Sequence, residues 1–190
     1  MTDPKYDWTS YLETQTAIAI MGPTASGKTA LALALSQKLP VEIINVDSVL
    51  IYRDLTIGAA KPSEEELARV PHHLINLLAQ NETYSVADFV RDAQGLATEI
   101  FARGRIPLLV GGTMMYFNAL TQGLSELPAA EPKIRARLQS EFDHVPVMLH
   151  QRLKAIDPIA AERINVADQQ RLIRAHEVYE VSGQTLTHLQ

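Results

Sequence analysis

Three short runs of apolar residues predict the strands of this chain. They cover residues 16–21, 41–46 and 106–110, and each is followed by glycine or aspartate. Short, almost wholly apolar runs bounded by turn residues are typical of strands that are buried on both faces of a parallel sheet. We therefore expect three strands with helices on both sides of the sheet.

Helical segments alternate with these runs. Residues 30–35 are strong helix formers, and they follow the first run closely. Ser85 and Asp88 stand at the spacing of a capping box, which opens a helix that continues to about Arg103, and Gly104 ends it. Alternating strands and helices predict a parallel sheet with right-handed crossovers, which is an α/β fold.

The pattern divides the chain into three parts. Residues 1–15 form a polar leader, residues 16–125 contain every predicted strand, and residues 126–190 show helical patterning that Pro146 and Pro158 interrupt. A length of 190 residues allows one substantial core, or one core with a small appended subdomain. We expect one main α/β domain followed by a helical region.

Composition and charge narrow the class of protein. The chain is 46% apolar and 21% charged, as in folded globular proteins, and it contains no cysteine, which excludes disulfides and thiolate chemistry. No run is apolar enough for a signal peptide or a membrane span, so a cytoplasmic protein, monomeric and away from membranes, is the expectation. The net charge is −5, and the acidic excess precedes Lys133, so we expect the C-terminal part to be the side that faces a polyanion.

A phosphate-binding motif follows the first strand. Residues 22–29, GPTASGKT, satisfy the pattern G-x-x-x-x-G-K-[ST] between a predicted strand and a predicted helix, the context of a Walker A loop. The backbone N–H groups would surround a diphosphate, Lys28 would meet its outer oxygens and Thr29 would hold Mg²⁺. The expected contacts comprise the whole motif: Gly22, Pro23, Thr24, Ala25, Ser26, Gly27, Lys28 and Thr29. ATP, another nucleotide or any other diphosphate ester would suit these groups, so the motif predicts a P-loop NTPase-like fold and leaves the reaction open.

Polar residues follow the other two strands. Asp47 and Ser48 come directly after the second strand, and Thr113 follows the third. Because the carboxyl ends of parallel strands meet at one edge of the sheet, we expect these residues to share a crevice with the phosphate loop.

Several sequence blocks in a fixed order resemble the tRNA dimethylallyltransferase family. The blocks are GPTASGKT at Gly22, VDSVLIYRDLTIGAAKP at Val46, VPHHLI at Val70, YSVADFVRDA at Tyr84, GRIPLLVGGTMMYFNAL at Gly104 and QQRLIRAHEVYEVSG at Gln169. The resemblance implies transfer of a dimethylallyl group from dimethylallyl diphosphate to the exocyclic N6 of the adenine that follows the tRNA anticodon, position 37. It covers about residues 16–190.

The resemblance also assigns roles to residues. Asp47 matches the family's catalytic aspartate, and a carboxylate would accept the proton of the adenine amine; a Mg²⁺ ligand or a kinase-type base is the alternative. Lys28 and Thr113 complete the catalytic set, although Thr113 could instead be a helix N-cap. Paired His72 and His73 are interpreted as structural, because no metal-ligand partner is evident.

A further set of positions matches the family's contacts to tRNA. Arg171 and Arg174 are three residues apart, so they would share a helix face and could grip phosphates. For Arg135 the alternative is a solvated helix face. The complete set is Asp47, Ser48, Val49, Leu50, Thr113, Arg135, Gln170, Arg171, Leu172, Ile173 and Arg174.

Two departures from the family pattern keep other functions open. Ala59 replaces a hydroxyl residue, and the family continues for on the order of a hundred residues past the position of Gln190. The alternatives are an adenylate prenyltransferase or a P-loop small-molecule kinase on the same scaffold, and an inactive truncated remnant that only binds diphosphate or tRNA.

Overall fold

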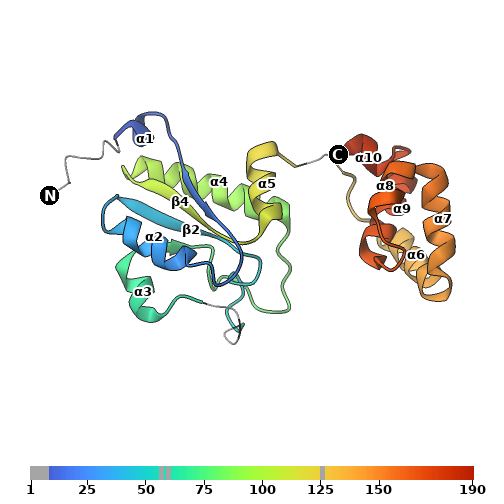
Figure 1. Cartoon of the computed structure of the whole chain (residues 1–190), viewed down its shortest axis with the longest axis horizontal. Helices are drawn as coiled ribbons and strands as arrows, with labels where there is room; N and C mark the ends of the chain where they lie inside the picture. Colours follow the sequence, from blue (N-terminus) through green and yellow to red (C-terminus); the bar gives the residue numbers. More distant parts are fainter. Residues whose placement is uncertain (1–8, 56–57, 59–60, 125–126) are drawn as a thin grey trace. The chain divides into compact units, whose positions relative to one another are not determined.

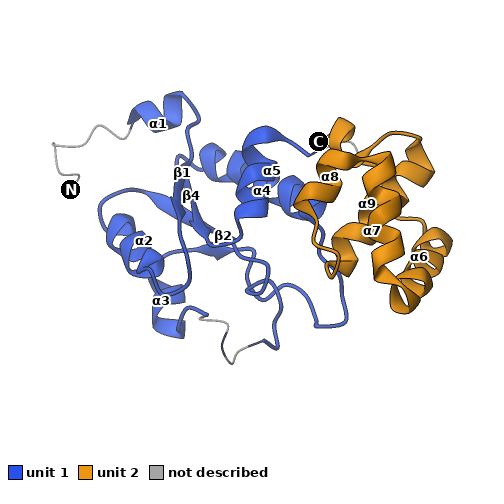
Figure 2. Cartoon of the chain, turned by 45° about the vertical axis from the view of Figure 1, so that its right-hand side comes forward, with its two compact units in different colours: residues 1–124 blue, residues 125–190 orange. Residues whose placement is uncertain are grey.

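The computed structural model describes residues 9–55, 58, 61–124 and 127–190. The chain forms two compact units, residues 1–124 and residues 125–190 (Figure 2). The expected domain boundary at residues 125 and 126 lies outside the described residues, as do Ala59 and most of the predicted leader.

A parallel four-stranded sheet forms the centre of the first unit (Figure 1). Its strands are β1 (Ile18–Met21), β2 (Val41–Val46), β3 (His72–His73) and β4 (Ile106–Gly111), in the order β1-β4-β2-β3. All three pairings are parallel, as the alternation of strands and helices predicted. The carboxyl ends of β1, β2 and β4 therefore lie at the same edge.

Helices cover both faces of this sheet. One face packs against α4 (Val86–Ala102) and α5 (Met114–Gln122), and the other packs against α2 (Lys28–Ser36) (Figure 1). Two shorter helices, α1 (Thr9–Glu13) and α3 (Glu64–Arg69), complete the described part of the unit. Every residue of β2 is buried, in agreement with the prediction of a strand covered on both faces.

The first strand departs from that prediction. Along β1 the side chains alternate between half-buried and exposed, and Met21 is 51% exposed. The reason is its position, because β1 occupies an edge of the sheet. Ile18 and Ile20 pack toward the core on the α2 side, whereas the other face of the strand is open.

Local capping signals match the helix ends. The hydroxyl of Ser85 accepts a hydrogen bond from the N–H of Asp88, and the carboxylate of Asp88 accepts one from the N–H of Ser85, so the predicted capping box is confirmed. After the helix, Gly104 adopts a φ of 67° and turns the chain toward β4.

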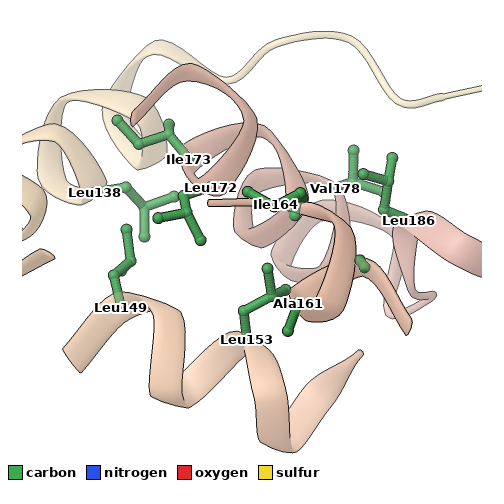
Figure 3. Close-up of a cluster of buried hydrophobic side chains, with 11 residues drawn as sticks. Leu138, Leu149, Leu153, Ala161, Ile164, Leu172, Ile173, Val178 and Leu186 are labelled. Atoms are coloured by element: carbon green, nitrogen blue, oxygen red, sulfur yellow. The ribbon is translucent and has the colours of Figure 1, made fainter. Parts of the chain in front are cut away.

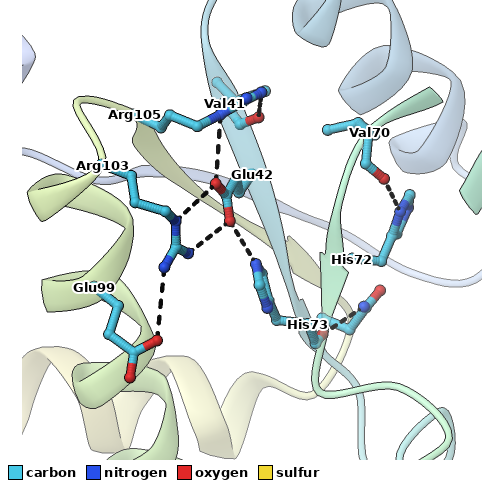
Figure 4. Close-up of polar contacts among 9 residues, drawn as sticks. Val41, Glu42, Val70, His72, His73, Glu99, Arg103 and Arg105 are labelled. Atoms are coloured by element: carbon cyan, nitrogen blue, oxygen red, sulfur yellow. Dashed lines mark hydrogen bonds and ion pairs between the residues drawn. The ribbon is translucent and has the colours of Figure 1, made fainter. Parts of the chain in front are cut away.

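An ion cluster around one buried carboxylate joins β2 to its neighbours (Figure 4). Glu42 of β2 accepts hydrogen bonds from Arg103 at 2.9 and 3.2 Å and contacts Nε2 of His73 at 2.7 Å, while Arg105 lies 3.4 Å away. Burial raises the pKa of Glu42, but the bonds from Arg103 and His73 outweigh it and leave the pKa below its usual value. The cluster links β2, β3 and the end of α4.

Helices joined by short loops make up the described part of the second unit, which contains no strand. Its helices are α6 (Pro132–His144), α7 (Pro146–Ile156), α8 (Pro158–Arg163), α9 (Gln169–Ser182) and α10 (Leu186–Leu189). Pro146 and Pro158 each occupy the first position of a helix, where a missing N–H is tolerated, so they start helices as well as separating them. Leu138, Leu149, Leu153 and Leu172 form the centre of a separate apolar core (Figure 3).

Candidate active site

Close approach of two strand ends shapes the candidate site. A Cβ atom at Gly111, the last residue of β4, would lie 1.9 Å from the carbonyl oxygen of Val46 at the end of β2. Only glycine fits this contact. Beyond it, the N–H of Thr113 donates to the same Val46 carbonyl at 3.2 Å, and the N–H of Gly22 donates to the carbonyl of Gly111 at 3.4 Å. The three strand ends are thereby joined.

The phosphate loop lies between β1 and α2, as predicted. Gly27, which precedes the first turn of α2, adopts a φ of 83°, and Ala25 adopts a φ of 64°, an uncommon conformation for a residue with a side chain. Strained backbone of this kind is concentrated at ligand-binding loops. The ammonium of Lys28 donates to the carbonyl of Pro23 at 2.5 Å, so the lysine closes over its own loop.

A cavity of about 430 Å³ opens beside this loop. Its walls include the loop from Thr24 onward, the polar residues Asn45 and Asp47, and the apolar residues Ile43 and Val110. The volume is within the usual range for small-molecule sites. The lining combines the phosphate loop and the cation of Lys28 with apolar side chains, a composition that suits a ligand with an anionic head and a hydrocarbon tail.

Asp47 stands at the end of β2 and lines the same cavity. Its Oδ1 accepts hydrogen bonds from the N–H groups of Val49 at 2.8 Å and Leu50 at 3.4 Å. These bonds fix the carboxylate, and among the described residues Oδ2 has no hydrogen-bond partner. The structure thus holds one oxygen of Asp47 in a turn and leaves the other for a ligand or a proton.

Thr113 and Ser48 meet across the sheet edge. The N–H of Ser48 donates to Oγ1 of Thr113 at 3.1 Å, and this hydroxyl lies 3.5 Å from Oγ of Ser48. Thr113 is the N-cap residue of α5, but its side chain makes no capping hydrogen bond. Its hydroxyl joins β2 to β4, and it stands beside the cavity rather than among the residues that line it.

The structure adds residues to the site that the sequence interpretation did not assign to it. Asn45 and His72 both line the cavity. The amide of Asn45 donates to the carbonyl of His73 at 2.7 Å, and Nδ1 of His72 bonds the carbonyl of Val70 at 2.8 Å, which leaves Nε2 of His72 as the acceptor nitrogen. Burial lowers the pKa of His72 and favours this neutral form. An asparagine near the carboxyl end of a mostly apolar run was the available signal for Asn45.

Lys61 organises the segment that follows Asp47. Its ammonium donates to the carbonyls of Tyr52 at 2.6 Å and Arg53 at 2.8 Å, and to Oδ1 of Asn76 at 2.6 Å. A single cation therefore joins the backbone at Tyr52 and Arg53 to the side chain of Asn76. Its place in the block VDSVLIYRDLTIGAAKP, which resembles the family, was the sequence signal for this residue.

The remaining predicted contact residues lie in the second unit. Arg171 is 73% exposed and pairs with Asp168 at 3.3 Å. Arg174 is more enclosed and bonds Glu177 at 2.7 Å and the carbonyl of Pro128 at 2.7 Å. Arg135 also bonds Glu177, so the described structure does not leave it as an isolated solvated residue.

Two residues of the same block are buried. Leu172 is 0% exposed and Ile173 is 5% exposed, and both side chains pack in the core of the second unit (Figure 3). Leu172 therefore anchors α9 and does not itself reach a macromolecule. Gln170, Arg171 and Arg174 are the members of this block whose polar groups reach the surface.

A parallel sheet with helices on both faces and a glycine-rich loop between β1 and α2 defines a P-loop protein with an NTPase-like fold. The family model described as IPP transferase matches residues 50–190, and a second, described as isopentenyl transferase, matches residues 15–81. The chain belongs to the IPP transferase family.

Individual relatives agree with this assignment. A tRNA dimethylallyltransferase of Hydrogenovibrio crunogenus is 56% identical over 179 residues, which are 94% of this chain and 55% of the relative. The crystal structure of a tRNA isopentenylpyrophosphate transferase from Bacillus halodurans is similar with a TM-score of 0.58 and 41% identity, over 90% of this chain and 57% of the other.

A eukaryotic dimethylallyltransferase acting on tRNA gives a TM-score of 0.71 at 28% identity, over 90% of this chain and 43% of the other. The chain spans about half the length of the curated relative that it matches.

Proposed function

We propose that this chain transfers a dimethylallyl group from dimethylallyl diphosphate to N6 of adenine 37, next to the anticodon of tRNA. In the reaction the bond between C1 and oxygen breaks, and its electron pair leaves with diphosphate. The N6 lone pair forms the new carbon–nitrogen bond, and the N6 proton leaves. The names of the relatives support this reaction. The residues of the first unit would supply the chemistry that it needs.

The phosphate loop would stabilise the leaving group. Diphosphate gains negative charge as the carbon–oxygen bond breaks, and preorganised N–H groups together with Lys28 oppose that charge most effectively in an enclosed site. The apolar residues that line the cavity, Ile43 and Val110 among them, would contact the five-carbon chain. This arrangement binds the donor by both of its ends.

Magnesium belongs to the proposal. Thr29 lines the cavity, and among the described residues no cluster of acidic or histidine side chains could hold a metal alone. That donor set fits Mg²⁺, which is commonly held by one or two protein oxygens together with phosphate oxygens and water. When bound, the ion would neutralise charge on diphosphate, and Thr29 would orient it.

The observation that carries the proposal is the position of Asp47. Its carboxylate borders the same cavity as the phosphate loop, and one of its oxygens is fixed by the N–H groups of Val49 and Leu50. An adenine amine is a weak nucleophile because its lone pair is delocalised into the ring. A fixed carboxylate that accepts the departing proton offsets this weakness.

The proposed acceptor is tRNA, and the enzyme is proposed to act as a monomer in the cytoplasm. Exposed Gln170 and Arg171, with Arg135 and Arg174, would contact the RNA. Separately, no helix in the described residues is long and apolar enough to cross a membrane.

The purified chain should be incubated with dimethylallyl diphosphate, Mg²⁺ and unmodified tRNA, and the digested nucleosides analysed by mass spectrometry. We expect dimethylallyladenosine at position 37, and a loss of about a hundredfold or more in rate for D47N with little change in diphosphate affinity. Parallel reactions contain AMP as the acceptor, or ATP with no prenyl donor. Absence of modified tRNA at high enzyme concentration, or product from AMP alone, would contradict the proposal.

A further inference from the structure

A polar pocket of about 390 Å³ opens on the second unit. Residues of α6 and α9 line it, and most of them are arginines and glutamines: Arg135, Gln139, Gln169, Gln170 and Arg174. Two guanidinium groups supply positive charge, and three carboxamides supply donors and acceptors. Gln139 and Gln169 each use one N–H on Oδ1 of Asp143, at 2.8 and 3.2 Å, and keep their amide oxygens as acceptors. A pocket of this composition is suited to an anion that carries polar groups, not to an apolar ligand.

One buried carboxylate lies behind the two arginines. Glu177 is 0% exposed, and its Oε2 accepts hydrogen bonds from Arg135 at 2.8 Å and from Arg174 at 2.7 Å. Its Oε1 accepts the N–H of Glu131 at 2.9 Å. A single oxygen therefore draws together two guanidinium groups from different helices, whereas the second oxygen fixes the start of α6.

The arrangement would be unfavourable without a structural reason. Two guanidinium groups repel each other, and a buried carboxylate loses its hydration. Burial raises the pKa of Glu177, but the bonds from Arg174, Arg135 and the Glu131 amide outweigh this effect and leave the pKa below its usual value. The glutamate is ionised at neutral pH, and the three groups together carry one net positive charge.

Both arginines retain donors for a ligand. Arg135 is 50% exposed and Arg174 is 28% exposed. Each guanidinium has five N–H donors, of which Arg135 uses one on Glu177, and Arg174 uses one on Glu177 and one on the Pro128 carbonyl. The other donors have no hydrogen-bond partner among the described residues, and both arginines line the pocket, where two guanidinium groups held on one carboxylate oxygen are suited to bind a phosphate.

We infer that Glu177 is a positioning residue that holds Arg135 and Arg174 as a clamp for one backbone phosphate of the RNA substrate. The inference rests on the proposed function, because it takes the phosphate from RNA. Gln139, Gln169 and Gln170 would contact the sugar or base beside that phosphate. Glu177 itself touches no ligand, and it acts through the geometry of the two arginines.

The E177Q variant separates positioning from simple charge. It removes one negative charge, so long-range electrostatics alone would make RNA binding tighter. The clamp requires the opposite, because the amide no longer holds two guanidinium groups on one oxygen. We expect the affinity of the full chain for a fluorescent anticodon stem-loop RNA to fall about tenfold. The plot of log affinity against log salt concentration should become shallower by about one released ion. Unchanged or tighter binding by folded E177Q would overturn the inference.

The matched control is E180Q. Glu180 lies one turn along α9 and pairs with Arg137 of α6, so E180Q makes the same charge change on the same helix pair without touching the pocket. Its RNA affinity should equal or slightly exceed that of the unaltered chain. A fall as large as that of E177Q would show a general effect of α9, and it would contradict the clamp.

A second test applies if E177Q does not fold by far-UV circular dichroism. R135Q and R174Q each keep Glu177 paired with one arginine. If both arginines bind one phosphate, the double variant should lose little more affinity than either single variant, whereas independent contacts would give additive losses. Additive losses would overturn the inference.

Prenyl transfer is measured on the same samples. If transfer is absent but RNA binds and E177Q weakens it, the proposed function fails and the clamp stands. If the unaltered chain does not bind the stem-loop above a mixed-sequence background, the clamp is contradicted whatever the activity.

Discussion

Gly111 and Val46 approach so closely that a methyl group at Gly111 would overlap the Val46 carbonyl, 1.9 Å from its oxygen. The contact joins the end of β4 to the end of β2. Asp47 follows Val46 directly, and Thr113 follows Gly111 after one intervening residue. Glycine at this position is therefore a condition for bringing the two strand ends together.

The variant G111A should be destabilised by at least about 2 kcal/mol, because backbone and not a flexible side chain must move. G95A is the matched control. Gly95 lies within α4, where an added methyl group would meet open space, so alanine there should stabilise the chain by about 0.5–1 kcal/mol. Urea titrations followed by circular dichroism measure both, and equal stabilities of the two variants would refute the role of the contact.

Thr113 should affect chemistry more than donor binding. T113V keeps the shape of the side chain but removes the acceptor of the Ser48 N–H, so the segment that holds Asp47 loses its link to β4. We expect the rate of prenyl transfer to fall about ten- to a hundredfold, while the affinity for dimethylallyl diphosphate changes less than about twofold. T113S retains the hydroxyl and should retain most of the activity. An equal loss in T113S and T113V would show that packing and not this bond matters.

Magnesium removal should weaken donor binding through Thr29. Isothermal titration of dimethylallyl diphosphate is expected to show an affinity at least about tenfold lower in EDTA than in Mg²⁺. In T29V the affinities measured in Mg²⁺ and in EDTA should be nearly equal, because the variant already binds dimethylallyl diphosphate weakly when Mg²⁺ is present. A T29V variant that responds to Mg²⁺ as strongly as the unaltered chain would remove Thr29 from the metal site.

Acid should destabilise the second unit through His176. This residue is 1% exposed, and burial lowers its pKa although its Nε2 bonds the Leu149 carbonyl at 2.9 Å. As pH falls below about 6.5, His176 takes up a proton in the unfolded chain before it does so in the folded chain. The free energy of unfolding that this difference contributes is therefore present above that pH and is lost below it.

H176Q replaces the titrating ring while keeping a donor of similar reach. Between about pH 7.5 and pH 5.5 its free energy of unfolding should fall less steeply than that of the unaltered chain, by up to about 1.4 kcal/mol per pH unit. Urea titrations at the two pH values measure the difference. Parallel slopes for the two proteins would show that His176 does not titrate on unfolding.

Local sequence was sufficient where local forces decide. The bounds of β2 and the capping box at Ser85 follow from neighbouring residues alone, and the structure confirms both. The prediction that β1 is buried on both faces was wrong. Burial of a strand depends on its place in the strand order, and an apolar run does not encode whether its strand is central or at an edge. The two-residue strand β3 is too short to produce a pattern.

The site shows the same division. The motif located the phosphate loop, and the rule that parallel strand ends meet brought Thr113 to Ser48, as observed. His72 could not be placed in the cavity, because the register of β3 against β2 puts it there. Glu177 looks like any polar helical residue in the sequence, and its burial appears only when α6 packs against α9.

Each unit has apolar cores of its own, and no described core cluster contains residues from both. Heating need not unfold such a chain in one cooperative step, so a calorimetric scan should be analysed for two transitions rather than for one midpoint. A ligand raises the midpoint of the unit that binds it, so a compound that shifts only one of the two transitions identifies the unit to which it binds.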